Sequence, residues 1–348
     1  MIPLVEIAPA YSIPRIILGG WQLSAGHSVA AVDRDAIFGL WDEALDRGLN
    51  TIDCADIYTG VEALIGEFVR RRRAAGVALP QVHTKLVPDR ASLGSLDRHY
   101  VERIVDRSLA RLAVDRLDLV QLHWWDYAVP GYLDALGWLS DLVRGGKIRS
   151  VGLTNFNTGR LQECLTVGLP IASLQLQYSA LDQRPARSLE KVAVANRIAM
   201  LAYGTLAGGF LTDRWLGQPE PAEPENRSLV KYRLVIAEMG GWKAFQKVLA
   251  CLAAIASRSE VPTAAVAIRM VLERRGVAAA IVGCRKREHL RMIDSVFNWS
   301  LTEADVAQLS QATGPSPGPA GDVYDAERAT EGPHAAIMRY DLNSMAKD

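Results

Sequence analysis

Four ionisable side chains between residues 53 and 123 follow short apolar runs, and their types suit proton transfer. Asp53 and Tyr58 lie in the stretch TIDCADIYTGVE, Lys85 closes the run QVHTK, and His123 closes LDLVQLH. An ammonium group close to a phenol favours the phenolate and lowers the phenol pKa, and a carboxylate keeps that ammonium group charged after burial. The four residues therefore predict a site in which Tyr58 donates a proton near neutral pH.

Each of these residues has a less specific explanation when it is taken alone. Asp53 and Lys85 could form a structural ion pair, Tyr58 could belong to a helix entry, and His123 could be a satisfied polar residue. Their coincidence at neighbouring strand ends favours chemistry. A neutral His123 would orient a carbonyl oxygen together with Tyr58, and the carbonyl carbon would then need a hydride. Reduction of a carbonyl group is therefore the predicted task.

Eight short runs rich in apolar residues predict β-strands, and most segments between them show helical periodicity. The predicted strands are RIILGG (15–20), NTIDCA (50–55), QVHTK (81–85), LDLVQLH (117–123), IRSVGLT (148–154), ASLQLQ (172–177), AMLAY (199–203) and AAAIVG (278–283). The clearest predicted helices are 33–48, 96–112 and 132–146.

Strict alternation of strands and helices predicts right-handed crossovers and a parallel sheet, and eight such units can close into a (β/α)8 TIM barrel with an inner wall of Ile, Leu and Val. An open doubly wound sheet is the rival, but the first strand is not followed by GxGxxG and the chain has no GxxxxGK[ST]. We therefore predict one α/β barrel domain over 1–348. Catalytic residues of such a barrel lie at the carboxyl ends of the strands, where Asp53, Lys85 and His123 are expected.

Two segments depart from the strand and helix alternation. Residues 204–242, after the seventh predicted strand, are too long and too rich in Pro and Gly for a minimal connection, and they predict a functional loop. A C-terminal helix is predicted at 301–313, and the tail 314–348 is either a flexible terminus or a cap over one barrel end.

Composition narrows the class of protein and of partner. The 348 residues carry 39 Lys and Arg against 39 Asp and Glu, so no net charge points to nucleic acid or to a membrane surface. The four cysteines (Cys54, Cys164, Cys251, Cys284) have neither CxxC spacing nor the pattern of a disulfide framework or zinc site. With no signal-like start and no run of about 20 apolar residues, we expect a soluble cytoplasmic protein that binds a small molecule and no metal.

The ordered motifs resemble the aldo-keto reductase superfamily from about Arg15 to Phe297. LGGWQ (18–22) resembles its first-strand signature, and GLNTIDCADIYTGVEALIGE (48–67) is similar to its most specific one. HTKLV, DLVQLHWWD and SVGLTNFN follow in the order and spacing of the family. The resemblance implies that Asp53, Tyr58, Lys85 and His123 form a catalytic tetrad with Tyr58 as general acid.

The resemblance also implies a nicotinamide cofactor that lies extended across the barrel end. Thr154, Asn155 and Gln175 would hold its carboxamide, and Tyr203 would stack on its ring. The backbone from 204 to 211 would follow the pyrophosphate, so that 204–242 would act as a strap over the cofactor. The remaining positions implied to contact the cofactor are Gly19, Gly20, Trp21, Asp53, Gly204, Thr205, Leu206, Gly208, Leu211, Gly283, Arg285 and His289.

The basic run in GCRKREHL (283–290) follows the last strand at a predicted helix N-terminus, where an anion is favoured. The implied anion is a 2′-phosphate on Arg285, so NADPH is the expected cofactor. The family usually has Gln and later Asn on this helix, where the chain has His289 and Ile293. Adenine recognition therefore departs from the family pattern, and NADH is kept as an alternative.

Aromatic residues beside the tetrad positions predict the substrate side. Trp21, Trp124 and Trp125 follow predicted strands, and together with Tyr58 and His123 they are the expected substrate contacts. At least one of the three tryptophans is expected to plug the barrel. An apolar or aromatic aldehyde or ketone fits such a site, and the residues do not select one compound, a direction of reaction or an oligomeric state.

Two other functions fit the same resemblance. Relatives of this fold serve as cofactor-binding regulatory subunits of membrane channels with little turnover, and a tight complex with a membrane protein would favour that function. A redox-neutral enzyme, such as an epimerase that keeps its NADP bound, would be favoured by a cofactor that copurifies and never turns over.

Overall fold

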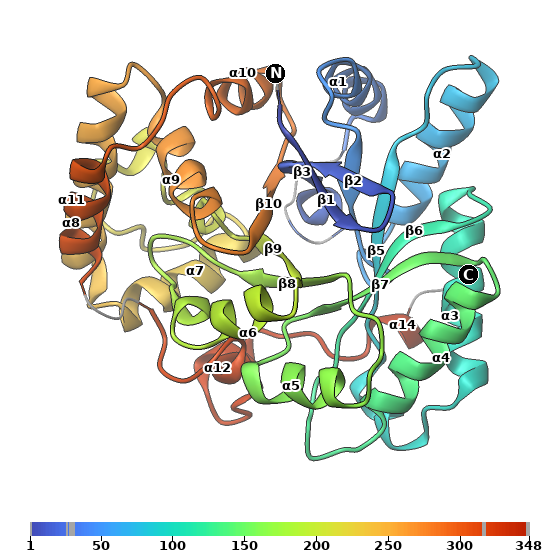
Figure 1. The fold of residues 1–348 in the computed structure, drawn as a ribbon. Coiled ribbons are helices and arrows are strands. Elements are labelled where there is room, and N and C mark those ends of the chain that lie inside the picture. Colours follow the sequence, from blue (N-terminus) through green and yellow to red (C-terminus); the bar gives the residue numbers. More distant parts are fainter. Residues whose placement is uncertain (1, 26, 28–31, 315–317, 346–348) are drawn as a thin grey trace.

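The computed structural model describes residues 2–25, 27, 32–314 and 318–345, and in them the predicted strands form one closed parallel barrel (Figure 1). The strands follow one another around the barrel in the order β10-β3-β4-β5-β6-β7-β8-β9, so the (β/α)8 prediction is confirmed. Their bounds are β3 Ile16–Gly19, β4 Thr51–Asp53, β5 Gln81–Leu86, β6 Leu117–Leu122, β7 Ile148–Thr154, β8 Ser173–Gln177, β9 Ala199–Tyr203 and β10 Val277–Gly283.

Helices surround the barrel, and the three clearest predicted ones are confirmed within two residues at each end. Asparagine and aspartate residues cap several of them; Asp97, for example, accepts a hydrogen bond from the amide of Tyr100. The helices that follow a strand are α1 Arg34–Asp46, α2 Val61–Ala74, α3 Arg98–Leu112, α4 Tyr132–Arg144, α5 Thr158–Thr166, α6 Leu189–Ala195 and α10 Arg287–Ser295, and α9 Thr263–Leu272 precedes β10.

An antiparallel hairpin that the sequence patterns did not predict closes the end of the barrel where the strands begin. It consists of β1 (Leu4–Ala8) and β2 (Tyr11–Pro14) and leads directly into β3. Tyr11 and Ile13 are buried against an apolar layer formed by Ile17, Leu119, Leu201, Ala279 and Ile281. The opposite end, where the carboxyl ends of the strands meet, is the mouth of the barrel.

The interior near the mouth is polar, which corrects the prediction of an Ile, Leu and Val inner wall. Asp53 on β4 accepts a hydrogen bond from Gln175 on β8, four strands away around the barrel, so both side chains must point inward. The branched apolar side chains of the same strands mostly face outward and pack under the helices. The prediction therefore holds only for the layer beside the hairpin.

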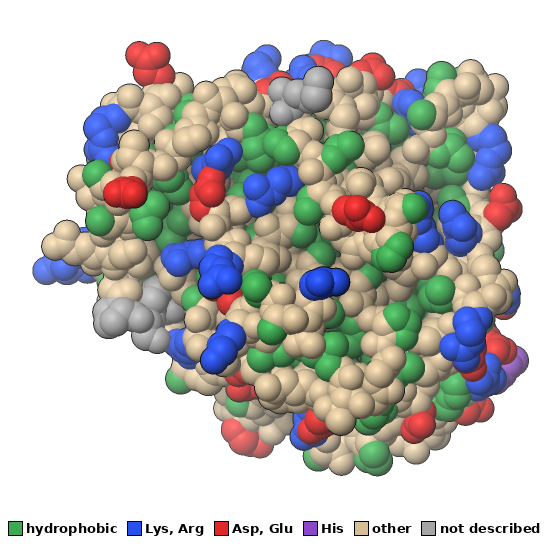
Figure 2. All heavy atoms as spheres, in the orientation of Figure 1, with side chains coloured by type: hydrophobic (Ala, Val, Ile, Leu, Met, Phe, Trp, Pro, Cys, Tyr) green, Lys and Arg blue, Asp and Glu red, His purple; other side chains and the backbone are tan. Residues whose placement is uncertain are grey.

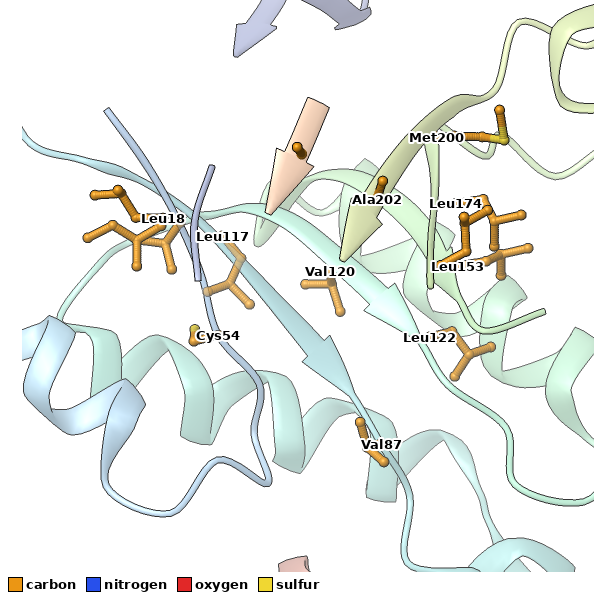
Figure 3. Packing of buried hydrophobic residues seen from close by; sticks show 14 of the residues in the cluster. Leu18, Cys54, Val87, Leu117, Val120, Leu122, Leu153, Leu174, Met200 and Ala202 are labelled. Atoms are coloured by element: carbon orange, nitrogen blue, oxygen red, sulfur yellow. The ribbon is translucent and has the colours of Figure 1, made fainter. Parts of the chain in front are cut away.

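Cys54 belongs to this outward packing. It directly follows Asp53, lies among residues such as Leu18 in Figure 3, and is fully buried. Burial raises the pKa of its thiol well above the ordinary value. Cys54 therefore serves packing, because neighbouring residues of a strand face opposite sides and Asp53 points inward.

The strap, residues 204–242, is more ordered than the predicted long loop. It contains the 3-10 turns η4 (Ala207–Gly209) and η5 (Asp213–Trp215) and the helix α7 (Arg227–Glu238), and it ends at the start of α8 (Gly241–Arg258). The apolar residues of α7 (Leu229, Tyr232, Val235, Ile236) recur at helical spacing and pack against α8. The helical periodicity of α7 is short and directly follows a Pro-rich stretch, so the sequence predicts a loop for the whole segment.

The C-terminal part begins with the predicted helix, α11 (Glu303–Thr313), which a capping box starts. The described part of the tail, residues 314 and 318–345, adds three four-residue helices, α12 (Asp325–Arg328), α13 (Pro333–Ala336) and α14 (Leu342–Met345). Hydrogen bonds tie it to backbone carbonyls that follow β5, β6 and β7. This part of the tail therefore lies on the mouth, as the cap alternative expected.

A buried ion cluster, called the latch, joins three segments at the mouth. Arg184, after β8, donates to both oxygens of Asp182 and contacts both oxygens of Glu327 in the tail. Lys231 of the strap lies 3.5 Å from Glu327 Oε1. Burial alone would raise the pKa of Glu327, but Lys231 and Arg184 lower it to about 2. The latch therefore connects the strap, the tail and the barrel.

Charged side chains of both signs are interspersed on the face drawn in Figure 2. Within the described residues, no single helix is long and apolar enough to span a membrane, and one pair, α8 with α9, meets those criteria only jointly, with a 100° bend. Groups of side chains that could hold a metal ion are also absent from that part of the chain.

Candidate active site

Asp53 and Lys85 form a buried ion pair at the carboxyl ends of adjacent strands. Lys85 Nζ donates to Asp53 Oδ2 at 2.7 Å and to the carbonyl oxygen of Cys54 at 2.8 Å. Burial alone would lower the pKa of Lys85, but Asp53 beside it raises the pKa above its ordinary value. Lys85 is therefore a permanent cation inside the mouth.

The second oxygen of Asp53 faces amide groups from across the barrel. Gln175 Nε2 donates to Asp53 Oδ1 at 2.6 Å, and Gln121 Nε2 lies 3.4 Å from the same oxygen. The carboxylate is thus held from three strands, which keeps it oriented toward Lys85. In this arrangement the Gln175 side chain is engaged by Asp53, whereas the resemblance assigns it to the cofactor carboxamide.

Tyr58 lies in the loop between β4 and α2, with its ring over Lys85. Lys85 Nζ is 5.0 Å from the ring centroid, and Trp21 packs against the other side of the site with its ring centroid 5.0 Å from that of Tyr58. Burial raises the pKa of the half-buried Tyr58, and Lys85 acts in the opposite direction. The predicted lowering by Lys85 is thus present, but burial outweighs it and the expected net direction was wrong.

His123 directly follows β6, and its imidazole is buried and neutral. Burial and the charge of Arg328 lower the pKa of His123 to about 3. His123 Nδ1 is 3.4 Å from the carbonyl oxygen of Thr154, a long contact that is a hydrogen bond only when Nδ1 carries the ring proton. Within the described residues, Nε2 is buried and has no hydrogen-bond partner. A buried orphan nitrogen of this kind suits a ligand atom.

Asp56 and the tail position the loop that carries Tyr58. Asp56 Oδ1 accepts from the amide of Ile57, and Oδ2 accepts from the amide of Val87 and from the side chain of Asn343. Burial raises the pKa of Asp56 to about 7, which these hydrogen bonds partly oppose. The tail residue Asn343 thus contacts the loop of the general acid candidate directly.

The three tryptophans divide between the site and the core. Trp21 contacts Tyr58, and Trp125 packs edge-on against His123 with ring centroids 4.3 Å apart. Trp124 is fully buried, and its Nε1 donates to the carbonyl oxygen of Val129. Trp124 therefore packs in the core and does not line the mouth, because alternate residues after β6 point to opposite sides.

The residues expected around the nicotinamide lie together at the ends of β7 and β9. Tyr203 Oη donates to Asn155 Oδ1 at 2.8 Å, and Asn155 itself has a left-handed backbone, φ 62°. Thr154 is buried and turns its carbonyl oxygen to His123. On the first strand, Gly19 pairs with Asp53, and a side chain at Gly20 would come within 2.8 Å of the Asp53 carbonyl oxygen. Close backbone approach thus requires glycine at position 20.

Residues 204–211 form a series of tight turns rather than an extended run. The amides of Ala207, Gly209, Phe210 and Leu211 donate to carbonyl oxygens inside the segment. Thr205 and Leu211 are buried, and Leu206 packs against the core. At Gly204 and Gly208, positive φ angles and the closeness of the Tyr232 ring exclude a side chain.

At the end of β10, Gly283 and Arg285 precede α10, whose first residue is Arg287. The amide of Arg285 donates to His289 Nδ1 at 3.2 Å, so one ring nitrogen of His289 is engaged. Arg287 pairs with Glu43 at 2.9 Å. Arg285 is exposed, and within the described residues no carboxylate lies at salt-bridge distance from it.

The sequence patterns did not predict that His27 and Arg227 belong to the same electrostatic environment as Arg285. His27 Nε2 lies 2.9 Å from Ser228 Oγ, and Trp21 Nε1 donates to the same oxygen. Burial and the charges of Arg285 and Arg227 together lower the pKa of His27 to about 4. No motif marks these residues, because they come from the loop after β3 and from the start of α7.

The tail residues at the mouth were also missed. Tyr324 packs edge-on against His123 with ring centroids 5.4 Å apart, and Arg328 donates to the carbonyl oxygens of Trp124 and Asn155. The only signal in the sequence was the cluster of aromatic and charged residues in GDVYDAER.

Comparisons with known proteins agree with this architecture. The model of the Aldo/keto reductase family matches residues 15–313. Aldo-keto reductase YhdN of Bacillus subtilis is 25% identical over 304 residues, which cover 85% of this chain and 88% of that protein. Protein tas of Escherichia coli is 26% identical over 340 residues, covering 86% and 95%. Flagellar radial spoke protein 5 of Chlamydomonas reinhardtii is 29% identical over 257 residues, 63% of this chain, and this chain spans about half, 49%, of that relative.

Solved structures share the fold. The glycerol dehydrogenase of Gluconobacter oxydans has a TM-score of 0.73 at 23% identity, with 92% of this chain and 97% of that chain covered. An aldo-keto reductase of Klebsiella pneumoniae, solved in complex with NADPH, has a TM-score of 0.70 at 22% identity and coverage of 93% and 99%. Because the family match spans most of the barrel, the chain belongs to the aldo/keto reductase family of NAD(P)H-dependent oxidoreductases.

Proposed function

We propose that this protein reduces an aldehyde or ketone to an alcohol with NADPH, with Tyr58 as the general acid. The observation that carries the proposal is the geometry at the mouth. A charged Lys85, held by Asp53, lies against the ring of Tyr58, while the unpartnered Nε2 of the neutral His123 lies at the next strand end. A donor, a cation and an orienting imidazole thus surround one place for a carbonyl oxygen.

The residues divide the work as follows. Bound NADPH supplies the hydride that the carbonyl carbon accepts. Tyr58 donates its phenolic proton to the carbonyl oxygen, and Lys85 stabilises the phenolate that remains. In the tautomer with its proton on Nε2, which gives up the long Nδ1 contact to the Thr154 carbonyl, His123 donates a hydrogen bond to the same oxygen and holds the carbonyl group in line. Asp53 keeps Lys85 charged and in place.

The residues along the cofactor path fit a phosphorylated dinucleotide. The charges of Arg285 and Arg227 both lower the pKa of His27, which lies 2.9 Å from Ser228, and in the described chain neither arginine has a carboxylate at salt-bridge distance. Two uncompensated guanidinium groups favour the pyrophosphate and the 2′-phosphate, which supports NADPH over NADH. Tyr203 and Asn155 would hold the nicotinamide end, and the strap would cover the pyrophosphate.

The remaining predictions stay open. A small carbonyl compound is the proposed substrate, with Trp21 and Trp125 beside it, and nucleic acid or membrane partners are not part of the proposal. The cytoplasmic location stays a prediction, and so does the role of His289 at the adenine. A regulatory subunit of a membrane channel and a redox-neutral enzyme are the competing functions.

The test is a fluorescence titration of the purified protein with NADPH and NADH, followed by a panel of aldehydes and ketones. We expect tighter binding of NADPH and carbonyl-dependent oxidation of NADPH over many turnovers. Tight NADPH binding with no turnover on any carbonyl compound would contradict the proposal and favour the regulatory function. A cofactor that copurifies and is never exchanged would favour the redox-neutral enzyme.

A further inference from the structure

A cavity of about 350 Å³ lies at the mouth, between the tail and the loops that follow β5 and β6. Aromatic rings form much of its wall, from Trp125, Tyr127 and Tyr340. Two guanidinium groups, those of Arg90 and Arg328, also line it. The cavity thus combines flat apolar walls with fixed positive charge, which are the features of a site for a small aromatic anion.

Arg328 is the charge in this cavity that has no anionic partner. Its guanidinium donates to the carbonyl oxygens of Trp124 and Asn155, and its Cζ lies 4.2 Å from the centroid of the Tyr127 ring. Within residues 2–25, 27, 32–314 and 318–345, no carboxylate lies at salt-bridge distance from it. A half-buried cation held only by neutral groups favours an added anion.

The carboxylates that line the cavity are already engaged by other groups. Asp126 accepts from Arg90 and from the amide of Ala128. Asp325 accepts from the side chain of Asn157 and from the amide of Asp322. Glu327 belongs to the latch and contacts Arg184 and Lys231. Each of these carboxylates has its own donors, so none offsets the charge of Arg328.

The position of Arg328 places it on the substrate side of the barrel. It lies over the ends of β6 and β7, and β6 is diametrically opposite β10, where the cofactor phosphates are proposed to bind. The indole ring of Trp125 separates the cavity from the tetrad, because Trp125 lines the cavity and also contacts His123. Tyr324 makes a similar link, since it packs against both His123 and Arg328.

We propose that Arg328 binds the carboxylate of the substrate, so that the preferred substrates are aromatic aldehydes or ketones that carry a carboxylate about one ring away from the carbonyl group. This inference rests on the proposed reductase function. The carbonyl group lies between Tyr58 and His123, the apolar body lies beside Trp125, and the carboxylate accepts hydrogen bonds from Arg328. The tail thereby supplies a specificity residue from outside the barrel.

The test compares 4-carboxybenzaldehyde with its methyl ester, which has no charge and is larger by one methyl group. The ester group withdraws electrons more strongly than the carboxylate, so a preference for the acid cannot come from carbonyl reactivity. We expect kcat/KM to favour the acid by about tenfold or more, the size of one charge-assisted hydrogen bond. Equal values for the two compounds, or a preference for the ester, would overturn the proposal.

Variants separate anion binding from tail anchoring. In Arg328→Gln, we expect the acid-to-ester ratio of kcat/KM to fall by about tenfold. Arg328→Lys keeps the charge and should retain part of the preference for the acid. Arg187→Gln is the matched control, because Arg187 also anchors the tail through backbone carbonyls, those of Pro319 and Gly321, but does not line the cavity. An unchanged ratio in Arg328→Gln would show that Arg328 only anchors the tail.

A binding measurement keeps this inference distinguishable from the proposed function. Terephthalate, a dianion of the same length without a reducible group, should quench tryptophan fluorescence through Trp125 in the presence of NADPH, and Arg328→Gln should weaken its binding about tenfold. If no carbonyl compound is reduced but this difference persists, the proposed function fails and the anion site stands. If aldehydes are reduced but neither the acid preference nor the difference is found, only the anion site fails.

Discussion

Two buried ion clusters at the mouth combine basic side chains with carboxylates but serve different roles. In the first, Lys85 donates to Asp53 and to a backbone carbonyl while a phenol and an orphan imidazole nitrogen lie beside it. In the latch, Arg184 contacts both oxygens of Asp182 and of Glu327, so the carboxylates are fully engaged. A cluster with open positions can act on a ligand, whereas a saturated one can only hold segments together.

The two clusters also differ in whether the sequence predicts them. Asp53 and Lys85 end adjacent strands, and their positions follow from the local strand pattern. Arg184 and Glu327 are 143 residues apart, and no repeat or spacing connects them. The predictions below test this division of roles, beginning with the largest expected effect.

Tyr58→Phe removes the proposed proton donor and should lower the rate of carbonyl reduction by about 10²–10⁴-fold. The dissociation constant of NADPH and the melting temperature should change little, because the ring and its packing against Trp21 remain. Tyr132→Phe, whose hydroxyl binds Glu163 at the rim, is the control. Steady-state kinetics are the measurement, and a Tyr58→Phe variant that is fully active would remove the first cluster from the chemistry.

Arg184→Met leaves the carboxylates of Asp182 and Glu327 buried without their main partner, so it should lower the free energy of unfolding by about 3–5 kcal/mol. Chemical denaturation measures the loss. Adding Asp182→Asn to the same chain should restore part of it, because Asp182 then has no cation at salt-bridge distance within the described residues, whereas Glu327 keeps Lys231. A stable Arg184→Met variant that has lost its activity would reverse the assigned roles of the two clusters.

Arg285→Ala tests a basic group that belongs to neither cluster. Because Arg285 has no carboxylate partner in the described chain, its charge is available to a phosphate, and its removal should weaken NADPH binding by about tenfold. NADH binding should change much less, since NADH lacks the 2′-phosphate. Equal losses for the two cofactors in a fluorescence titration would argue against recognition of that phosphate.

The pH dependence of stability tests the neutral state of His123. Its pKa is lowered from 6.5 to about 3 in the folded chain, so the unfolded chain binds one more proton between these values. Stability from this residue is therefore complete above about pH 6.5 and falls with acidification, by about 1.4 kcal/mol per pH unit.

His123→Gln should make the pH slope of the unfolding free energy shallower by that amount between about pH 6 and 4. The groups that titrate in both proteins, including Asp56, cancel in the difference. Identical slopes in urea denaturation across this range would show that His123 is already charged in the folded protein.

The smallest effect is expected at Cys54. Its full burial and raised thiol pKa predict that a thiol reagent applied to the native protein leaves Cys54 unmodified, as read by mass spectrometry, and that activity is kept. Rapid labelling of Cys54 with loss of activity would mean that the wall behind Asp53 opens in solution.

Several features of the fold and site could be predicted because their signals are local. The strands show as apolar runs, and the positions of Asp53, Lys85 and His123 follow directly from where those strands end. The prediction failed where a weak local signal depended on distant partners. Helix α7 is short and follows a Pro-rich stretch, so it was not predicted. The strands of the N-terminal hairpin pair with each other and pack on the end of the barrel where the strands begin. The net pKa direction of Tyr58 failed because burial cannot be computed from spacing.

By itself, the sequence determined the strand order, the closed barrel and the placement of Asp53, Lys85 and His123 at one mouth, because these depend on hydrophobic periodicity and on short connections. Only the tertiary structure decided that Arg328, Tyr324 and Asn343 of the tail join that mouth. The physical reason is that hydrogen bonds and ion pairs between segments far apart in the chain leave no periodic trace in either segment.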